Sequence, residues 1–253
     1  MTDLKVIVRF TAVALMLFFT AVAAECATPT PYSRLELKAD RFFAQKEWAQ
    51  ASATYYQMLE QRPDVAATYG KAIVAGAVRG DTLAQMELMA RAMRNKIPFD
   101  SVLSRVKSTS FELGRSNLYG DFLHLLRKGY PWMRRPIDNY LLRYYTYRHD
   151  GRRMMEYSTM MLQGAPGNVD FLMTLGQGAM LCGKYEEGIN AYERILAVNP
   201  ENYDALLALG NYYYVTGNSV RALPYLQRAQ AIRPTPHVQQ IISSLLGGRH
   251  VKA

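Results

Sequence analysis

Apolar residues recur along most of the chain at the three- and four-residue spacing of an α-helix. In the clearest segment, Leu172, Leu175 and Ala179 share one helical face. Gly183 follows them and supplies a residue that tolerates the left-handed conformation found where helices end. A second apolar stripe stops at Pro200, because proline lacks the amide hydrogen that a continuing helix needs. The pattern predicts two consecutive helices joined by a short turn.

The same pair of helices recurs 34 residues later, so that residues 168–200 align with residues 202–234 without a gap. The identities fall at the first-helix cap, inside both helices, in the turn and at the closing proline. The matching pairs are Asn168 and Asn202, Asp170 and Asp204, Leu172 and Leu206, Leu175-Gly176 and Leu209-Gly210, Gly183 and Gly217, Arg194 and Arg228, Ala197 and Ala231, and Pro200 and Pro234. A fixed period of this length indicates a stacked array of helix pairs.

Prolines extend the period towards the N-terminus, and their spacings of 35, 33, 35, 34 and 34 residues predict about six helix pairs. These prolines are Pro63, Pro98, Pro131, Pro166, Pro200 and Pro234. Residues 66–99 are interrupted by Arg79-Gly80-Asp81, a helix stop followed by a new start. Residues 100–134 carry the weakest pattern, with two apolar stretches around Gly114. After the last unit, an apolar face formed by Val238, Ile241, Ile242, Leu245 and Leu246 predicts a terminal helix that caps the array.

Three units resemble the tetratricopeptide repeat, a helix–turn–helix unit of 34 residues. The residues that carry the resemblance are Leu206, Leu209-Gly210, Tyr213, Ala222, Leu226, Ala229 and Pro234 in unit 203–236; Leu172, Leu175-Gly176, Ala179, Gly188, Tyr192, Ile195 and Pro200 in unit 169–202; and Leu35, Ala39, Phe42, Ala51, Tyr55, Met58 and Pro63 in unit 32–65. The resemblance implies an all-α fold, a right-handed α-solenoid of helix–turn–helix repeats with a C-terminal capping helix. Gly176 and Gly188 are expected where paired helices approach closest.

The predicted organisation follows from these units. It consists of a signal peptide at 1–23, a linker at 24–31, a repeat-like unit at 32–65, two degenerate helical pairs at 66–134, a degenerate repeat-like unit at 135–168, repeats at 169–202 and 203–236, and the capping helix at 235–247.

The N-terminus has the features of a targeting segment. Lys5 and Arg9 lead into fifteen uncharged residues, Phe10 to Ala24, a run shorter than the about 20 apolar residues of a membrane-spanning helix. Ala21-Val22-Ala23 fits the small-residue pattern of a signal cleavage site. We therefore expect an exported protein, periplasmic or secreted. The alternative is an uncleaved N-terminal segment that anchors the chain in a membrane.

The amino-acid composition bears on whether the chain is folded, binds a metal or catalyses a reaction. Of the 253 residues, 49% are hydrophobic and 20% are charged, which excludes a mainly disordered chain. The two cysteines and four separated histidines do not have metal-ligand spacing, and no nucleophile or phosphate-binding motif is present. We therefore expect no enzymatic activity, no metal and no cofactor. Cys182 is expected to be a free and mostly buried thiol, with a bridge to Cys26 as the alternative.

The resemblance also implies a concave surface lined by the first helix of each pair. Carried over position by position, it places nine residues there: Asn139, Arg143 and Tyr147; Met173, Gln177 and Met180; and Leu207, Asn211 and Tyr214. Gln177 and Asn211 occupy the same position in adjacent units, where a side-chain amide can hold a peptide backbone. Family members that clamp a C-terminal carboxylate use a lysine where this chain has Met173 and Leu207. An internal, partly apolar segment or a folded partner suits these residues better.

The chain has a formal net charge of +9, and many of the positive residues lie between 127 and 153. This basic patch includes Arg134, Arg135, Arg148, Arg152 and Arg153, with tyrosines between them. Such a stretch is most often a solvated helix face. Its functional alternative is binding of anionic lipid or glycan, because export removes the chain from nucleic acid.

These observations favour a non-catalytic scaffold or adaptor of the cell envelope that binds a protein or peptide partner and no nucleic acid. Two alternatives stay open. One is a basic-patch module that contacts a membrane surface or glycan, and the other is an accessory subunit of an envelope enzyme. The sequence does not determine the oligomeric state.

Overall fold

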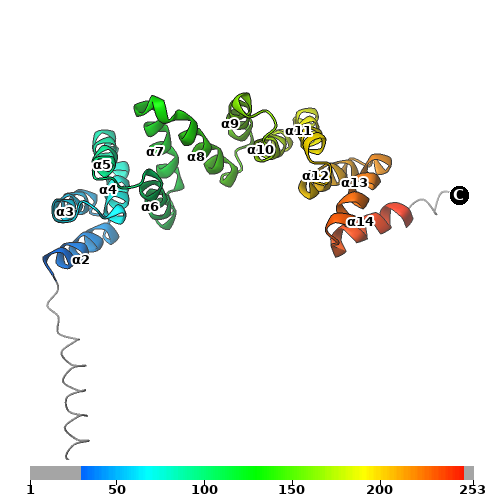
Figure 1. The fold of residues 1–253 in the computed structure, drawn as a ribbon. Coiled ribbons are helices and arrows are strands. Elements are labelled where there is room, and N and C mark those ends of the chain that lie inside the picture. Colours follow the sequence, from blue (N-terminus) through cyan, green and yellow to red (C-terminus); the bar gives the residue numbers. More distant parts are fainter. Residues whose placement is uncertain (1–29, 248–253) are drawn as a thin grey trace, which may run out of the picture. The chain divides into compact units, whose positions relative to one another are not determined.

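The computed structural model describes residues 30–247, and in this range it contains thirteen α-helices, one short 3₁₀ turn and no strand (Figure 1). The predicted signal peptide, residues 24–29 of the predicted linker and Cys26 lie outside the described residues. In chain order the elements are α2 (Pro31–Ala44), α3 (Trp48–Gln61), α4 (Ala66–Val78), α5 (Thr82–Arg94), α6 (Phe99–Glu112), α7 (Ser116–Gly129), η1 (Pro131–Met133), α8 (Arg134–Tyr147), α9 (Gly151–Gly164), α10 (Val169–Leu181), α11 (Tyr185–Val198), α12 (Tyr203–Val215), α13 (Ser219–Ile232) and α14 (Pro236–Gly247).

The described residues divide into two compact units, 30–122 and 123–247. In the first unit α2 packs on α3, and α4 packs on α3, α5 and α6. Its core includes fully buried Tyr55, Tyr69, Ile73 and Leu88. The predicted interruption at Arg79-Gly80-Asp81 is confirmed: α4 ends at Val78, Gly80 adopts φ +72°, and the Asp81 carboxylate accepts a hydrogen bond from the Ala84 amide at the start of α5.

The second unit contains the helix pairs α8–α9, α10–α11 and α12–α13, followed by α14. Adjacent helices pack on one another throughout. The predicted caps are confirmed, because the side chains of Asn168 and Asn202 accept hydrogen bonds from Phe171 and Ala205 at the first turns of α10 and α12. The terminal helix buries four residues of the predicted face, since Val238, Ile241, Ile242 and Leu245 join the core of this unit, but Leu246 is 41% exposed.

Two of the repeated identities have a common structural reason. Arg194 donates a hydrogen bond to the Pro166 carbonyl at 2.9 Å, and Arg228 donates to the Pro200 carbonyl at 2.6 Å. Each arginine thereby ties the second helix of its pair to the turn that precedes the pair. The 34-residue identity of these arginines and prolines thus reflects one interaction made in two successive units.

Glycines allow the paired helices of the second unit to approach closely. A Cβ atom on Gly176 would lie 2.5 Å from the Tyr192 ring, and one on Gly188 would lie 2.9 Å from Met180. The prediction for these two glycines is confirmed. Gly151 and Gly178, which the sequence analysis did not single out, make a further contact of this kind between α9 and α10.

The buried Tyr192 predicts alkaline sensitivity. Burial raises the pKa of Tyr192 to about 12, whereas an unfolded chain has a tyrosine pKa of about 10. The folded state therefore holds this proton more tightly. We expect the free energy of unfolding to lose this contribution as the pH rises from about 10 to about 12, and to keep it below pH 10. Urea unfolding of wild type and Tyr192→Phe across this range measures it, and the variant should show a shallower decline; equal slopes would contradict the prediction.

Candidate functional site

A hollow of about 440 Å³ lies between the first helices α8 and α10 of the second unit. The predicted residues Asn139 and Arg143 line it from α8. Across from them α10 contributes Asp170, Phe171 and Thr174. Half-buried Phe171 and buried Leu142 supply its apolar surface, and the other side chains are polar or charged. Two residues predicted for the concave surface thus line one wall of this hollow, and the residues of the opposite wall were not predicted.

Some polar side chains of this hollow are hydrogen-bonded within the protein, and others have no partner among the described residues. The Thr146 hydroxyl donates to the Leu142 carbonyl, and the Thr174 hydroxyl donates to the Asp170 carbonyl. Over residues 30–247, no hydrogen bond or ion pair engages the side chains of Asn139, Arg143 or Asp170. One amide, one guanidinium and one carboxylate are therefore available here to a ligand.

A second hollow adjoins the first at Thr146, which lines both. The predicted residues Gln177 and Met180 lie in it, together with Leu181, which is 55% exposed. Met154, His149 and Tyr192 complete its lining. It is more apolar than the first hollow, because thioether, leucine and aromatic groups supply most of its surface. Gln177 is the exposed amide at its edge.

A third hollow lies between α12 and α14 and has a volume of about 540 Å³. Asn211 and Tyr214, both predicted, line it from α12 beside Val215, which is 80% exposed. The capping helix contributes His237, Gln240, Ile241 and Ser244. The capping helix thus has two faces, one in the core and one beside this hollow.

Three predicted residues lie elsewhere. Met173 and Leu207 are half-buried and pack against the hydrophobic core of the second unit, so most of their surface is unavailable to a partner. Tyr147 is 61% exposed at the end of α8 and lines none of the three hollows. Six of the nine predicted residues therefore line hollows along first helices.

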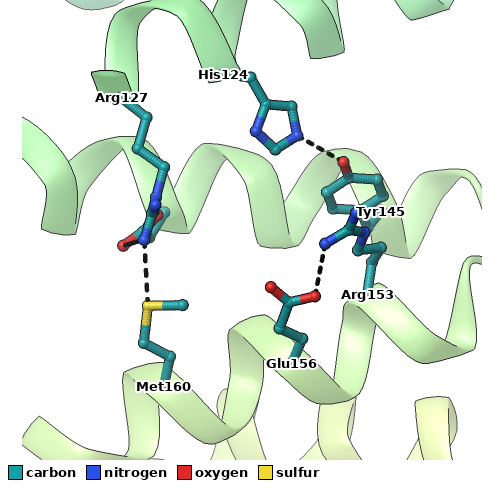
Figure 2. A network of polar contacts seen from close by, with 7 residues as sticks. His124, Arg127, Tyr145, Arg153, Glu156 and Met160 are labelled. Atoms are coloured by element: carbon teal, nitrogen blue, oxygen red, sulfur yellow. Dashed lines mark hydrogen bonds and ion pairs between the residues drawn. The ribbon is translucent and has the colours of Figure 1, made fainter. Parts of the chain in front are cut away.

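A polar network beside the hollows holds α7, α8 and α9 together (Figure 2). His124 of α7 and the Tyr145 hydroxyl of α8 share a hydrogen bond of 2.7 Å. Arg153 of α9 pairs with Glu156 and lies over the Tyr145 ring. Burial raises the pKa of Tyr145, and the nearby Arg153 charge opposes that rise. The network attaches α8 to α7 and α9 through Asp138 and Tyr145, and other residues of α8 line the first hollow.

The centre of this network is an ion pair between Arg127 and Asp138. Asp138 is 4% exposed, and the Arg127 Nε donates to its carboxylate at 2.5 Å. This hydrogen bond raises the pKa of Arg127. The guanidinium also reaches the Met160 sulfur of α9, as Figure 2 shows. We assign this ion pair a structural role, because the two charges neutralise each other.

The predicted basic patch consists of two groups at opposite ends of α8. Arg134 and Arg135 begin the helix, whereas Arg148 caps its C-terminus and Arg152 follows in α9. A helix of 14 residues is about 20 Å long, so the two groups are separate surfaces. All five arginines of the patch are exposed, but Arg153 is engaged with Glu156.

Cys182 differs from its expectation. It is a free, exposed thiol that caps the C-terminus of α10, beside Gly151. The helix ends one residue before Cys182, and the chain turns at Gly183 with φ +71°, so this position lies at the rim of the packed surface. The expectation of a mostly buried thiol was wrong.

In the part of the chain that the structure describes, no three histidine, cysteine, aspartate or glutamate side chains lie together as metal ligands. Within the same residues, none of the helices combines the length and the hydrophobicity needed to cross a membrane.

Comparison with known proteins supports the repeat interpretation. Residues 174–235 match the model of the tetratricopeptide repeat family. No curated protein sequence matches the chain. Among solved structures, a tetratricopeptide repeat protein from Parabacteroides merdae is 13% identical, with 87% of each chain covered and a TM-score of 0.47. PilW, a widely conserved type IV pilus biogenesis factor, is 14% identical, with 85% of this chain and 100% of PilW covered and a TM-score of 0.49.

The family match covers most of the second helix pair of this unit, α10–α11, and all of the third, α12–α13. The Asn202 cap and the contact between Arg228 and the Pro200 carbonyl lie inside the matched residues. Tetratricopeptide repeats are a fold that serves protein–protein interaction. The 34-residue period, the helix pairs and the family match identify residues 174–235 as tetratricopeptide repeats within an all-α chain.

Proposed function

We propose that the protein is a non-catalytic scaffold of the cell envelope that holds an extended segment of a partner protein along the first helices of its second unit. The observation that carries this proposal is the row of hollows on α8, α10 and α12. Each hollow is lined by residues that occupy the binding positions of a tetratricopeptide repeat, and each lies beside the first helix of a pair.

The chemistry of the hollows favours a partner segment of mixed polarity. The first hollow offers Arg143, Asp170 and Asn139, which bind charged side chains and backbone amides. The adjoining second hollow offers Met180, Leu181 and Tyr192, which suit a bulky apolar side chain. The repeat array supplies rigid elements for these groups, and an extended segment with a polar and an apolar anchor can contact both hollows.

The envelope location rests on the N-terminal sequence. Lys5, Arg9 and the uncharged run from Phe10 to Ala24 have the order of a secretory signal. Fractionation of cells that express a C-terminally tagged chain tests this. We expect the tag in the envelope fraction, with Edman sequencing showing a new N-terminus near Glu25; a cytoplasmic chain with an intact N-terminus would contradict it.

The binding surface predicts the effect of one triple variant. Arg143→Ala, Gln177→Ala and Asn211→Ala remove one ligand-facing group from each hollow. We expect the affinity for the partner to fall at least about tenfold, because each lost polar contact contributes about 0.5–1.5 kcal/mol. The partner is first captured with the tagged wild-type protein and identified by mass spectrometry, and the affinities are then measured with purified components.

A matched variant controls for the number and type of changes. Arg152→Ala, Gln163→Ala and Asn190→Ala remove the same three residue types from exposed positions on second helices α9 and α11. This variant should bind like wild type, and both variants should keep the helical circular dichroism signal. Equal affinity of the first-helix variant and wild type would refute the binding surface.

A further inference from the structure

A tryptophan projects from the 3₁₀ turn η1 that leads into α8. The Trp132 side chain is 76% exposed, although it makes an edge contact with the Tyr130 ring at 5.4 Å between centroids. Tyr130 is 7% exposed and therefore belongs to the protein interior. Its contact with Trp132 holds one edge of the indole, and most of the indole surface remains accessible to solvent. Trp132 lines none of the three hollows.

Basic residues flank this tryptophan in the sequence. Lys128, Arg134 and Arg135 are exposed and lie within four residues of it on either side. Between residues 122 and 149 the chain has a single acidic residue, Asp138, and its carboxylate is buried against Arg127. The local field at the turn is therefore positive.

The neighbouring helix end adds no opposing charge. A Cβ on Gly164 would lie 2.6 Å from the Arg135 Nη2, so the Arg135 guanidinium covers the last residue of α9. From residue 157 to residue 169 the chain has no acidic residue, and Glu156 is paired with Arg153. The surface formed by Trp132, Lys128, Arg134 and Arg135 thus combines one large amphipathic ring with three cations, and we call it the Trp132 surface.

We infer that the Trp132 surface docks on an anionic lipid bilayer. Indole rings favour the boundary between headgroups and acyl chains, because they present an apolar body and one hydrogen-bond donor. Lysine and arginine are attracted by the negative potential of anionic headgroups. A single projecting ring flanked by cations, which lines none of the three hollows, suits a deformable anionic surface better than a shape-matched protein pocket. This contact is independent of the hollows proposed to bind a partner protein.

The two tryptophans of the chain allow a direct test. Trp48→Phe leaves Trp132 as the single indole, and Trp48 packs against Phe43, where phenylalanine keeps an aromatic contact. Full-length Trp48→Phe protein is titrated with vesicles of phosphatidylglycerol and phosphatidylcholine, or of phosphatidylcholine alone. We expect the Trp132 emission to shift to shorter wavelength only with the anionic vesicles, and salt to reverse the shift. The apolar N-terminal run carries no tryptophan, so the emission reports on the surroundings of Trp132 alone.

Charge variants locate the contact. Each basic residue near an anionic surface strengthens binding by about fivefold, so Arg134→Gln with Arg135→Gln should weaken vesicle binding by about 25-fold. Arg148→Gln with Arg152→Gln removes the same charge from the opposite end of α8 and should leave binding nearly unchanged. Trp132→Ala should also weaken binding, with an unchanged circular dichroism spectrum.

Three results would overturn the inference. The first is an unchanged Trp132 emission at saturating anionic vesicles. The second is an equal loss of binding in the two double-arginine variants, which would indicate net charge alone. The third is tight binding of a soluble polyanion such as heparin, with no vesicle binding. None of these results would affect the partner-protein proposal, because its variants do not change the Trp132 surface.

Discussion

Gly178→Val is expected to lower the free energy of unfolding by about 3 kcal/mol, at the upper end of the usual cost of overpacking. A Cβ at Gly178 would lie 2.9 Å from the Gly151 carbonyl oxygen and 2.9 Å from the Met154 Cβ. Neither atom belongs to the end of a flexible side chain. Relief therefore requires α9 and α10 to separate, which breaks contacts along both helices. Urea unfolding followed by circular dichroism measures the loss.

Gly167→Val is the matched control for this prediction. No atom lies within 4 Å of a Cβ built at Gly167, which belongs to the turn between α9 and α10. We expect this control to change the stability by less than about 0.5 kcal/mol. If the two valine variants unfold at the same urea concentration, the close approach of α9 and α10 does not restrict the residue size at Gly178, and the prediction is wrong. Because Met154 and Gln177 line one hollow from these two helices, Gly178→Val should also weaken partner binding.

Arg127→Met is expected to lower the free energy of unfolding by about 3 kcal/mol, because it leaves the Asp138 carboxylate buried without its cation. The methionine keeps most of the apolar stem, so the lost packing is small. The effect should lie at the lower end of the range for buried pairs, since the Arg127 side chain is 31% exposed and water reaches it. Chemical denaturation of the purified protein gives the value.

A double-variant cycle separates the pair from its surroundings. Asp138→Asn removes the unpaired charge, so Arg127→Met with Asp138→Asn should be more stable than Arg127→Met alone. Arg153→Met is the exposed counterpart, because Arg153 and Glu156 are 44% and 47% exposed, and it should cost less than about 1 kcal/mol. Equal costs for Arg127→Met and Arg153→Met would contradict the structural role given to the Asp138 pair.

Local sequence determined the helices, their caps and their turns. Asn168, Asn202 and Asp81 cap helices because a short polar side chain reaches the free amides of the first turn, and this depends only on neighbouring residues. Gly183 and Gly217 end helices because they adopt positive φ, an intrinsic property of glycine. The 34-residue repeat then predicted which helices come first and second in each pair, and six of the nine residues expected on the concave surface line hollows beside first helices.

Tertiary structure decided everything that depends on two helices meeting. Asp170, Phe171 and Thr174 form the second wall of the first hollow only because α8 and α10 both line it, which the local sequence does not show. Met173 and Leu207 turned towards the core for the same reason.

Two further features that the sequence did not predict also depend on how far apart residues lie in the folded chain. Gly151 and Gly178 are 27 positions apart, and their contact follows from the crossing of α9 and α10. The basic stretch is continuous in sequence, but α8 places its two groups of arginines at opposite ends of a 14-residue helix. They lie far apart because each helical residue adds about 1.5 Å along the axis. Residue type and period thus determined the helical repeat of this protein, whereas the packing of helix on helix decided which side chains face a partner, the core or solvent.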